Sequence, residues 1–367
     1  MIALFMDVTG RSAGPGAATH LRSQPRSARS SPRVAALCRL ALCFAAIASQ
    51  AGPAFQFPTA NRSLLEPSGS ARFFAPTAGR TWTAGQFGCV RSDGWQMHEG
   101  IDILFTQKDR RGEPTDEVRA AADGEIAYVS RKPGLSNYGI YAVLRHRIEG
   151  LEVYTVYAHL RQVRGEWSPG ASVRAGDVLG VMGRTTNTKS PIGKDRAHLH
   201  FEITLLVNPS FSAWLKQREP DARDDHGMWN GRNLLGIDPA EVFREQQNRG
   251  ARFSLLDHVR QQRELFRVYI ADTSFPWLKR YPQLIRRNPT AERDGIVGYE
   301  VSFNFNGLPF RLVPRSRTEL NGPQKTRLLS VDEAVYRDSP CRKLVFRRGQ
   351  SWTLTAHGDE LISLLVR

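Results

Sequence analysis

Short runs of apolar residues, each bounded by Gly, Asn or Pro, follow one another from about residue 80 to residue 209. The runs are rich in β-branched and aromatic residues, a pattern typical of β-strands rather than helices. It predicts strands at residues 124–129, 140–145, 151–157 and 178–182. We therefore expect a small antiparallel β-sheet, barrel-like domain over residues 85–209.

The pattern changes after residue 209. In the connecting segment 210–250, residues 214–219 are a candidate helix, and Asp238 followed by Pro239 predicts the N-cap and first residue of another. Residues 251–367 are expected to form a second unit that opens with a helix carrying Leu255, Leu256, Val259, Leu265 and Phe266.

The second unit is expected to continue as strands. Asn306 and Gly307 form a strong hairpin-turn signal between alternating segments. Strands are predicted at residues 299–305, 308–313, 344–346, 352–355 and 361–366. The fold is therefore predicted to be mainly β, with a separate C-terminal β-rich (α+β) domain of unknown function.

The N-terminal segment predicts export. Residues 34–48 are apolar, follow Arg29 and Arg33, and end in an Ala-Ile-Ala cleavage pattern. These features are typical of a secretory signal peptide, here within residues 1–50 and preceded by a long basic extension. The apolar run is short for a membrane span. We expect a linker at residues 51–84, no stable span after cleavage, and a secreted or periplasmic protein of the cell envelope.

Charge and cysteine content leave alternatives open. The net charge is +15, of which the first 50 residues contribute +5 through six Arg and one Asp, leaving +10. A basic protein is attracted to polyanions. No nucleic-acid motif is present, so we expect no nucleic-acid partner, whereas an anionic membrane surface or wall polymer would fit. Cys89 and Cys341 remain after the signal peptide, either as a disulfide or as two free thiols.

Two histidine fragments suggest a metal site. His198 and His200 alternate with apolar residues, so on a strand both imidazoles share one face, about 7 Å apart. His98 and Asp102 would lie about 13 Å apart on a straight strand, too far to share one cation. The chain must therefore bend between them, which Gly100 permits. This places His98 on an approach loop and Asp102 at the head of a strand.

The donor set indicates catalysis rather than structural metal binding. Two histidines and one carboxylate, His98, Asp102 and His200, leave the fourth tetrahedral position of zinc for water. His159 and His198 then remain for proton transfer and oxyanion stabilisation. Glu202 shares the face of His200, so it either orients that ligand or is a surface carboxylate. For His146, His226, His258 and His357 a packing or solvent role is expected.

Three fragments together resemble the lysostaphin/LytM-type zinc endopeptidases. They are His98-Glu99-Gly100-Ile101-Asp102, Val156-Tyr157-Ala158-His159-Leu160 and His198-Leu199-His200-Phe201-Glu202. The resemblance implies one Zn²⁺ ion held by His98, Asp102 and His200, with His159 and His198 as the catalytic pair. It also implies peptide cross-links of peptidoglycan as substrate. Residues 186–197 depart from the family pattern, because this loop is longer and more basic.

Three classes of function remain. The first is a secreted zinc endopeptidase of the cell wall. The second is a non-catalytic cell-wall-binding scaffold that uses this fold to bind and activate another wall hydrolase. The third is a carbohydrate- or wall-binding module, which would have to rest on residues 251–367 alone; the same residues could also bind a protein partner. The presence of all three ligands and both catalytic histidines favours the enzyme.

Overall fold

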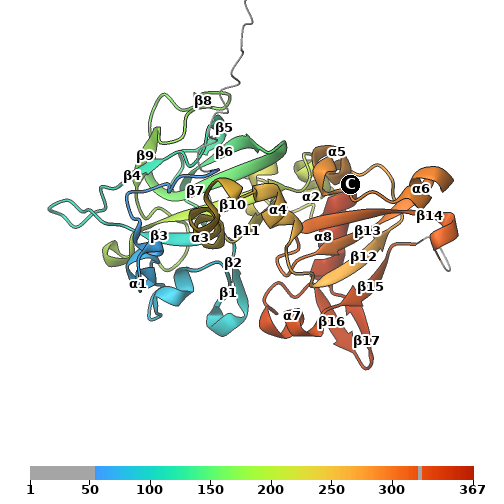
Figure 1. Cartoon of the computed structure of the whole chain (residues 1–367). Coiled ribbons are helices and arrows are strands. Elements are labelled where there is room, and N and C mark those ends of the chain that lie inside the picture. Colours follow the sequence, from blue (N-terminus) through green and yellow to red (C-terminus); the bar gives the residue numbers. More distant parts are fainter. Residues whose placement is uncertain (1–53, 321–324) are drawn as a thin grey trace, which may run out of the picture. The chain divides into compact units, whose positions relative to one another are not determined.

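An antiparallel sheet, which includes β3, β7 and β10 in Figure 1, carries Asp102, His159, His198 and His200, whereas His98 lies outside it. The structure, a computed structural model, describes residues 54–320 and 325–367; the predicted signal peptide lies outside them. Strands run in the order β11-β10-β7-β6-β5-β8, with β3 paired to β10, and β9 paired to β4 and β7. Their bounds are β3 Ile101–Leu104, β4 Glu117–Arg119, β5 Gly124–Ser130, β6 Ile140–Ile148, β7 Leu151–Val163, β8 Ser172–Val173, β9 Val178–Met182, β10 His198–Leu206 and β11 Leu234–Ile237.

The predicted antiparallel sheet is confirmed, and two of its strands are much longer than predicted. Strand β7 continues past Tyr157 to Val163, so His159 lies within a strand. The strand continues because it changes partner: it pairs with β6 up to Leu160 and then with β9. The polar residues after His159 gave no sign of this second pairing.

Helix α3 (Pro239–Arg249) covers the apolar face of β10. The Phe243 ring stacks on Phe57 and lies 6.0 Å from Phe201 of β10. The Asp238 carboxylate accepts a hydrogen bond from the Ala240 N–H, which confirms the predicted N-cap. All residues of β10 are buried. Because side chains alternate along a strand, the polar side chains of His198, His200 and Glu202 lie on the face opposite α3.

A second antiparallel sheet follows, in the order β14-β13-β12-β15. Gly307 has a φ of +87°, as the predicted turn between β13 and β14 requires. Strands β16 and β17 form a separate hairpin. The bounds are β12 Phe266–Ile270, β13 Ile296–Phe303, β14 Pro309–Ser316, β15 Arg327–Val331, β16 Val345–Arg348 and β17 Ser351–Leu354.

Two predictions for this region are wrong. Phe266 opens β12 instead of extending the preceding helix, which ends at Arg260. Residues 361–366 belong to helix α8 (Ala356–Val366) and not to a strand. The Thr355 hydroxyl accepts a hydrogen bond from the Gly358 N–H and caps the start of this helix. The continuous apolar run LISLLV has no periodicity that distinguishes a helix from a strand. The chain is therefore mixed and strand-rich rather than mainly β.

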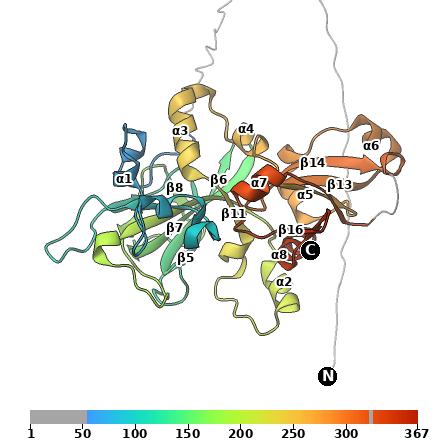
Figure 2. The same cartoon turned by 90° about the horizontal axis from the view of Figure 1, so that it is seen from below.

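The other helices are short. Helix α2 (Phe211–Arg218) corresponds to the candidate helix at residues 214–219. Helix α6 (Pro289–Asp294) lies beside β14 (Figure 2). Among the described residues, no helix has the length and apolar character that a membrane crossing needs. The α-helices not yet given are α1 Ser70–Phe73, α4 Leu255–Arg260, α5 Pro276–Arg280 and α7 Glu333–Asp338.

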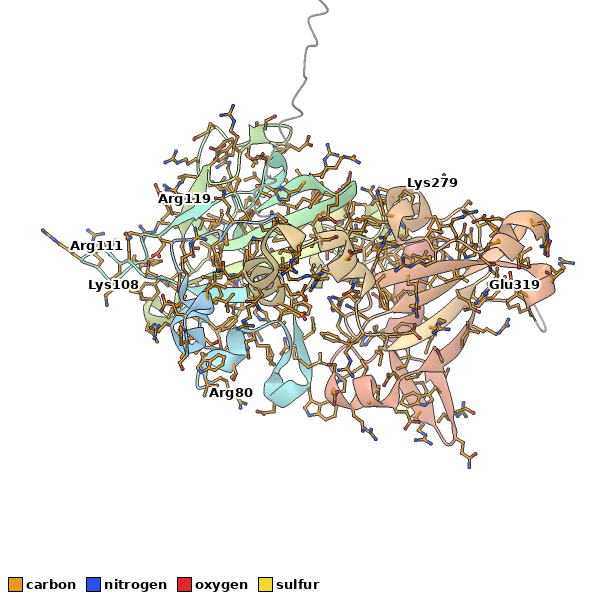
Figure 3. The ribbon with its side chains drawn as sticks, in the orientation of Figure 1. Arg80, Lys108, Arg111, Arg119, Lys279 and Glu319 are labelled. Atoms are coloured by element: carbon orange, nitrogen blue, oxygen red, sulfur yellow. A yellow bond between two sulfur atoms is a disulfide. The ribbon has the colours of Figure 1, made fainter. Side chains whose placement is uncertain are left out.

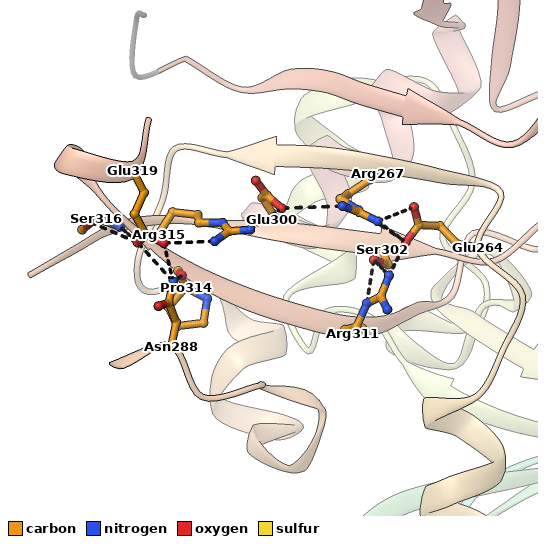
Figure 4. Close-up of polar contacts among 10 residues, drawn as sticks. All are labelled: Glu264, Arg267, Asn288, Glu300, Ser302, Arg311, Pro314, Arg315, Ser316 and Glu319. Atoms are coloured by element: carbon orange, nitrogen blue, oxygen red, sulfur yellow. Dashed lines mark hydrogen bonds and ion pairs between the residues drawn. The ribbon is translucent and has the colours of Figure 1, made fainter. Parts of the chain in front are cut away.

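The polar face of the second sheet is a network of paired charges (Figure 4). Arg311 donates to Glu264 and to Ser302, and Arg315 donates to Glu300 and Glu319. Other basic side chains are exposed: Lys108, Arg111 and Lys279 extend away from the ribbon (Figure 3). Part of the positive charge therefore lies on the surface of the protein.

Cys89 and Cys341 form a disulfide, which decides between the two alternatives left open by the sequence. A disulfide is consistent with an oxidising, extracytoplasmic compartment. Within Gln50–Arg367 the described residues belong to one compact unit. The boundaries proposed at residues 84, 209 and 250 remain predictions.

Candidate metal centre

Strands β3 and β10 bring two of the predicted ligands together. His200 and Asp102 are directly opposite each other in this antiparallel pair. The His200 Nδ1 atom lies 3.0 Å from Asp102 Oδ1. Because cross-strand neighbours are the closest side chains that a sheet offers, the register alone places both donors on one side of β10.

His98 reaches the same point from outside this sheet. It ends β2 (Gln96–His98), which among the described residues pairs with β1 (Gly88–Arg91) alone, so His98 is on a short strand and not on the predicted loop. Its Nε2 atom lies 3.1 Å from Asp102 Oδ1 and 3.1 Å from His200 Nδ1. These three side chains form a buried group able to hold a metal ion.

The chain bends at Gly100, as the spacing of His98 and Asp102 requires. The glycine is needed for space, because a Cβ atom there would lie 2.3 Å from the Phe201 carbonyl oxygen. Strand β10 thus runs directly against the backbone between the two ligands.

Hydrogen bonds select the nitrogen that each histidine presents. His98 Nδ1 is 2.6 Å from the Gln86 carbonyl oxygen, so Nδ1 donates there and Nε2 keeps its lone pair. His200 Nε2 is 2.8 Å from Glu202 Oε1, which leaves the Nδ1 lone pair toward Asp102. The lone pairs of His98 Nε2 and His200 Nδ1 and the Asp102 Oδ1 atom lie about 3 Å from one another. They repel each other unless a proton or a cation lies between them.

Glu202 and Tyr138 support His200 from behind. Glu202 is fully buried, which excludes the surface role considered for it, and the Tyr138 hydroxyl donates to its Oε1 at 2.6 Å. Burial and the charge of Glu202 raise the pKa of Tyr138 well above its ordinary value, so the phenol keeps its proton. Tyr138 was missed in the sequence because a single tyrosine before β6 belongs to no spacing pattern.

The site favours positive charge at its centre. Burial alone would raise the pKa of the Asp102 carboxyl, but His198 and His98 hold it well below its usual range. Burial alone would lower the pKa of His200, but hydrogen bonds to Asp102 and Glu202 raise it to about 10. A metal cation bound at His200 Nδ1 supplies the positive charge that these carboxylates stabilise.

His159 and His198 lie beside this group with their rings 5.0 Å apart. In both rings Nδ1 donates a hydrogen bond to a backbone carbonyl. His159 Nδ1 is 2.9 Å from the Thr185 carbonyl oxygen, and His198 Nδ1 is 2.6 Å from the Arg196 carbonyl oxygen. Burial, followed by the proximity of the His198 and His200 rings, lowers the pKa of His159 to about 3. Burial also lowers the pKa of His198. Both rings are therefore neutral near pH 7 and can accept a proton through Nε2.

The backbone of His159 is strained, with a φ of +61°, in the left-handed region that non-glycine residues rarely adopt. Its N–H donates to the Tyr138 carbonyl at 2.9 Å, which holds this conformation. The strain turns the imidazole toward His198 and His200.

Arg91 is a further residue at the centre that sequence reasoning missed. Its guanidinium donates to Asp102 Oδ2 and lies 3.0 Å from His98 Nε2. It also borders a cavity of about 930 Å³ that is lined by residues 77–81, 83, 84, 89–94 and 96. A metal ion bound at His98 Nε2 would require the Arg91 guanidinium to move away from that nitrogen. The guanidinium could still keep its hydrogen bond to Asp102 Oδ2.

The remaining buried histidines are structural, as expected. His146 bridges the Asp123 carbonyl and the Thr155 hydroxyl, at 2.8 and 2.7 Å. His226 packs on the rings of Tyr128 and Tyr141.

Comparison with known proteins finds one family. The family model "Peptidase family M23" matches residues 96–210. "DD-carboxypeptidase/endopeptidase Mpg" of Neisseria meningitidis serogroup B is 37% identical over 118 residues, 31% of this chain and 22% of that protein. The protein of the same name from Neisseria gonorrhoeae matches equally. The chain thus spans less than a quarter of the length of these relatives.

Solved structures show only a distant likeness. The catalytic domain of lysostaphin from Staphylococcus simulans has a TM-score of 0.26 and 20% identity, covering 44% of this chain and 87% of that one. Helicobacter pylori Csd3 has a TM-score of 0.26 and 17% identity, covering 54% and 41%. Likeness at this level does not bear on function.

Proposed function

We propose that the chain is a secreted zinc metalloendopeptidase that hydrolyses peptide bonds in peptidoglycan cross-links. The match of residues 96–210 to peptidase family M23 supports this proposal. The observation that carries the proposal is the buried group of His98, Asp102 and His200 beside two neutral histidines. Three protein ligands with a neighbouring acid–base pair suit hydrolysis, whereas a structural zinc site takes four protein ligands.

The donor set fits zinc. Two imidazole nitrogens and one carboxylate oxygen are ordinary zinc ligands, and each histidine donates its other nitrogen to an oxygen acceptor, as metal-bound histidines generally do. Zinc held there would polarise the peptide carbonyl and lower the pKa of a water molecule.

The protein's own residues would move the protons. His159 and His198 each present Nε2 near the three ligands, that of His198 at 3.5 Å from Asp102 Oδ1. One of the two rings can therefore take a proton from the attacking water and return it to the leaving amine. The protonated ring can also stabilise the developing oxyanion. The short distance between the two rings suits this exchange.

Export and substrate complete the proposal. The predicted signal peptide and the Cys89–Cys341 disulfide both favour a workplace outside the cytoplasm, secreted or periplasmic. The basic surface would attract an anionic wall polymer.

The test is digestion of purified peptidoglycan by the chain without residues 1–50, with and without a chelator, followed by analysis of the fragments. We expect new peptide ends that disappear with the chelator and with His200→Ala. His159→Ala should bind zinc but lose turnover by roughly 100-fold or more. His357→Ala changes an exposed histidine outside the centre and should retain full activity.

Two results would count against the proposal. No new peptide ends under any condition would refute the peptidase and favour the wall-binding scaffold. Cleavage that survives complete removal of metal would refute the zinc mechanism.

A further inference from the structure

The β1–β2 hairpin holds His98 differently from the other two ligands. Asp102 and His200 are fixed by the ladder between β3 and β10, within the main sheet. The hairpin forms a two-stranded sheet of its own and ends at His98, opposite Gly88. The position of His98 therefore depends on what the hairpin packs against.

A disulfide joins the hairpin to the C-terminal part of the chain. Cys89 of β1 is bonded to Cys341, across 252 positions of sequence. The Cys341 N–H also donates to Cys89 Sγ at 3.3 Å, and Cys341 Sγ lies 3.8 Å from the sulfur of Met97. Met97 is buried and directly precedes His98, so the Cys341 contacts reach both strands of the hairpin.

A second contact reaches the segment between the two ligands. Arg342 lies 3.6 Å from the carboxylate of Glu99, the residue after His98. The Arg342 Nε donates to the Asn306 carbonyl at 3.4 Å, and Asn306 Nδ2 donates to the Gly236 carbonyl of β11. Arg342 is thus held by the β13–β14 turn, which is itself bonded to the main sheet.

Aromatic packing adds a third contact at the start of the hairpin. The rings of Phe87 and Phe305 meet edge to face, with centroids 5.9 Å apart. Phe305 also lies against Gly88, where an added Cβ would be 3.7 Å from the ring, an ordinary van der Waals contact. Gln86, next to Phe87, accepts the hydrogen bond that sets the tautomer of His98.

We infer that Cys341 and Arg342 are positioning residues of the metal centre, which hold His98 in place through the β1–β2 hairpin. This gives the C-terminal region a role in the reaction itself, and it rests on the zinc centre proposed above. Residues that orient metal ligands typically change metal affinity 10- to 100-fold when removed. Loss of the disulfide frees the hairpin and should have an effect of that size.

The test measures zinc affinity directly, by competition with a chelator on metal-free protein without residues 1–50. We expect the double variant Cys89→Ser with Cys341→Ser to bind zinc roughly 10- to 100-fold more weakly than the unchanged protein. Arg342→Gln, which keeps the disulfide, should weaken binding about two- to fivefold, as a partly exposed ion pair allows. The Co²⁺-loaded double variant should also change its visible absorption, since one nitrogen ligand is loosened.

The controls separate positioning from general damage. Arg347→Gln removes an ion pair with Glu333 in the same region, away from the hairpin, and should leave affinity unchanged. Reduction of the unchanged protein with a phosphine, which lacks a thiol, should reproduce the double variant. If the double variant does not fold, Arg342→Gln alone decides.

Unchanged zinc affinity in the folded variants would overturn the inference. A protein that binds zinc but cuts no peptidoglycan would instead refute the proposed function, and the affinity comparison would still decide the role of Cys341 and Arg342.

Discussion

Replacing Glu202 with glutamine tests how the metal centre stabilises positive charge. Glutamine has nearly the same shape and keeps an oxygen that can accept from His200 and Tyr138, as Glu202 does at 2.8 and 2.6 Å. The substitution therefore removes a buried negative charge while the packing is retained.

Against the effect of burial, hydrogen bonds to Asp102 and Glu202 raise the pKa of His200 from 6.5 to about 10, so both carboxylates favour positive charge on this ring. Residues that hold the outer nitrogen of a metal-bound histidine typically change metal affinity 10- to 100-fold when they are replaced. We expect Glu202→Gln to weaken zinc binding by an amount in that range, roughly 10- to 100-fold.

The assay is the zinc dissociation constant at pH 7.5, measured by chelator competition on metal-free protein. Glu219→Gln serves as the matched control, because Glu219 is a partly exposed carboxylate paired with Arg232 outside the centre. The reasoning fails if Glu202→Gln, correctly folded, binds zinc within about twofold of the unchanged protein.

Two further predictions concern stability. Gly100→Ala should lower the unfolding free energy by about 1–3 kcal/mol, because its Cβ would meet the Phe201 carbonyl at 2.3 Å. The control is Gly134→Ala, whose added methyl group meets no atom within 4 Å. Urea titration would compare the unfolding free energies of the two variants, and an equal decrease in both would contradict the steric argument. Burial lowers the pKa of His146 from 6.5 to about 4, so the unfolded chain binds this proton first. Stability is therefore retained above pH 6.5 and falls by up to about 3 kcal/mol as the pH drops to 4. His146→Gln should lose this component of the pH dependence, and an unchanged pH profile in urea titrations would count against it.

The sequence was sufficient for the part of the site that depends on local geometry. Alternation along a strand correctly placed His198 and His200 on one face, and the distance between His98 and Asp102 correctly demanded a bend. The opposition of Asp102 and His200 could not be predicted from local pattern, because it depends on the register of two strands about a hundred residues apart.

Residues outside any spacing pattern were missed. Arg91 and Tyr138 reach the centre only because the hairpin and the segment before β6 fold back toward it. In the C-terminal region, a continuous apolar run at residues 361–366 could not distinguish a strand from a buried helix, and the helix prevailed through its Thr355 cap. Cysteine spacing likewise could not decide whether Cys89 and Cys341 pair.

The separation of the ligands along the chain has a consequence for when the protein becomes active. His98 and His200 are 102 positions apart, and the disulfide beside them closes a still longer loop. Contacts of such high sequence separation form late and at a large entropic cost, so an unfolded or translocating chain has no ligand set to offer. Metal can bind tightly only to the finished fold and adds its binding energy to that state alone. Under the proposed function, the chain would therefore acquire its hydrolytic activity only when folding is complete.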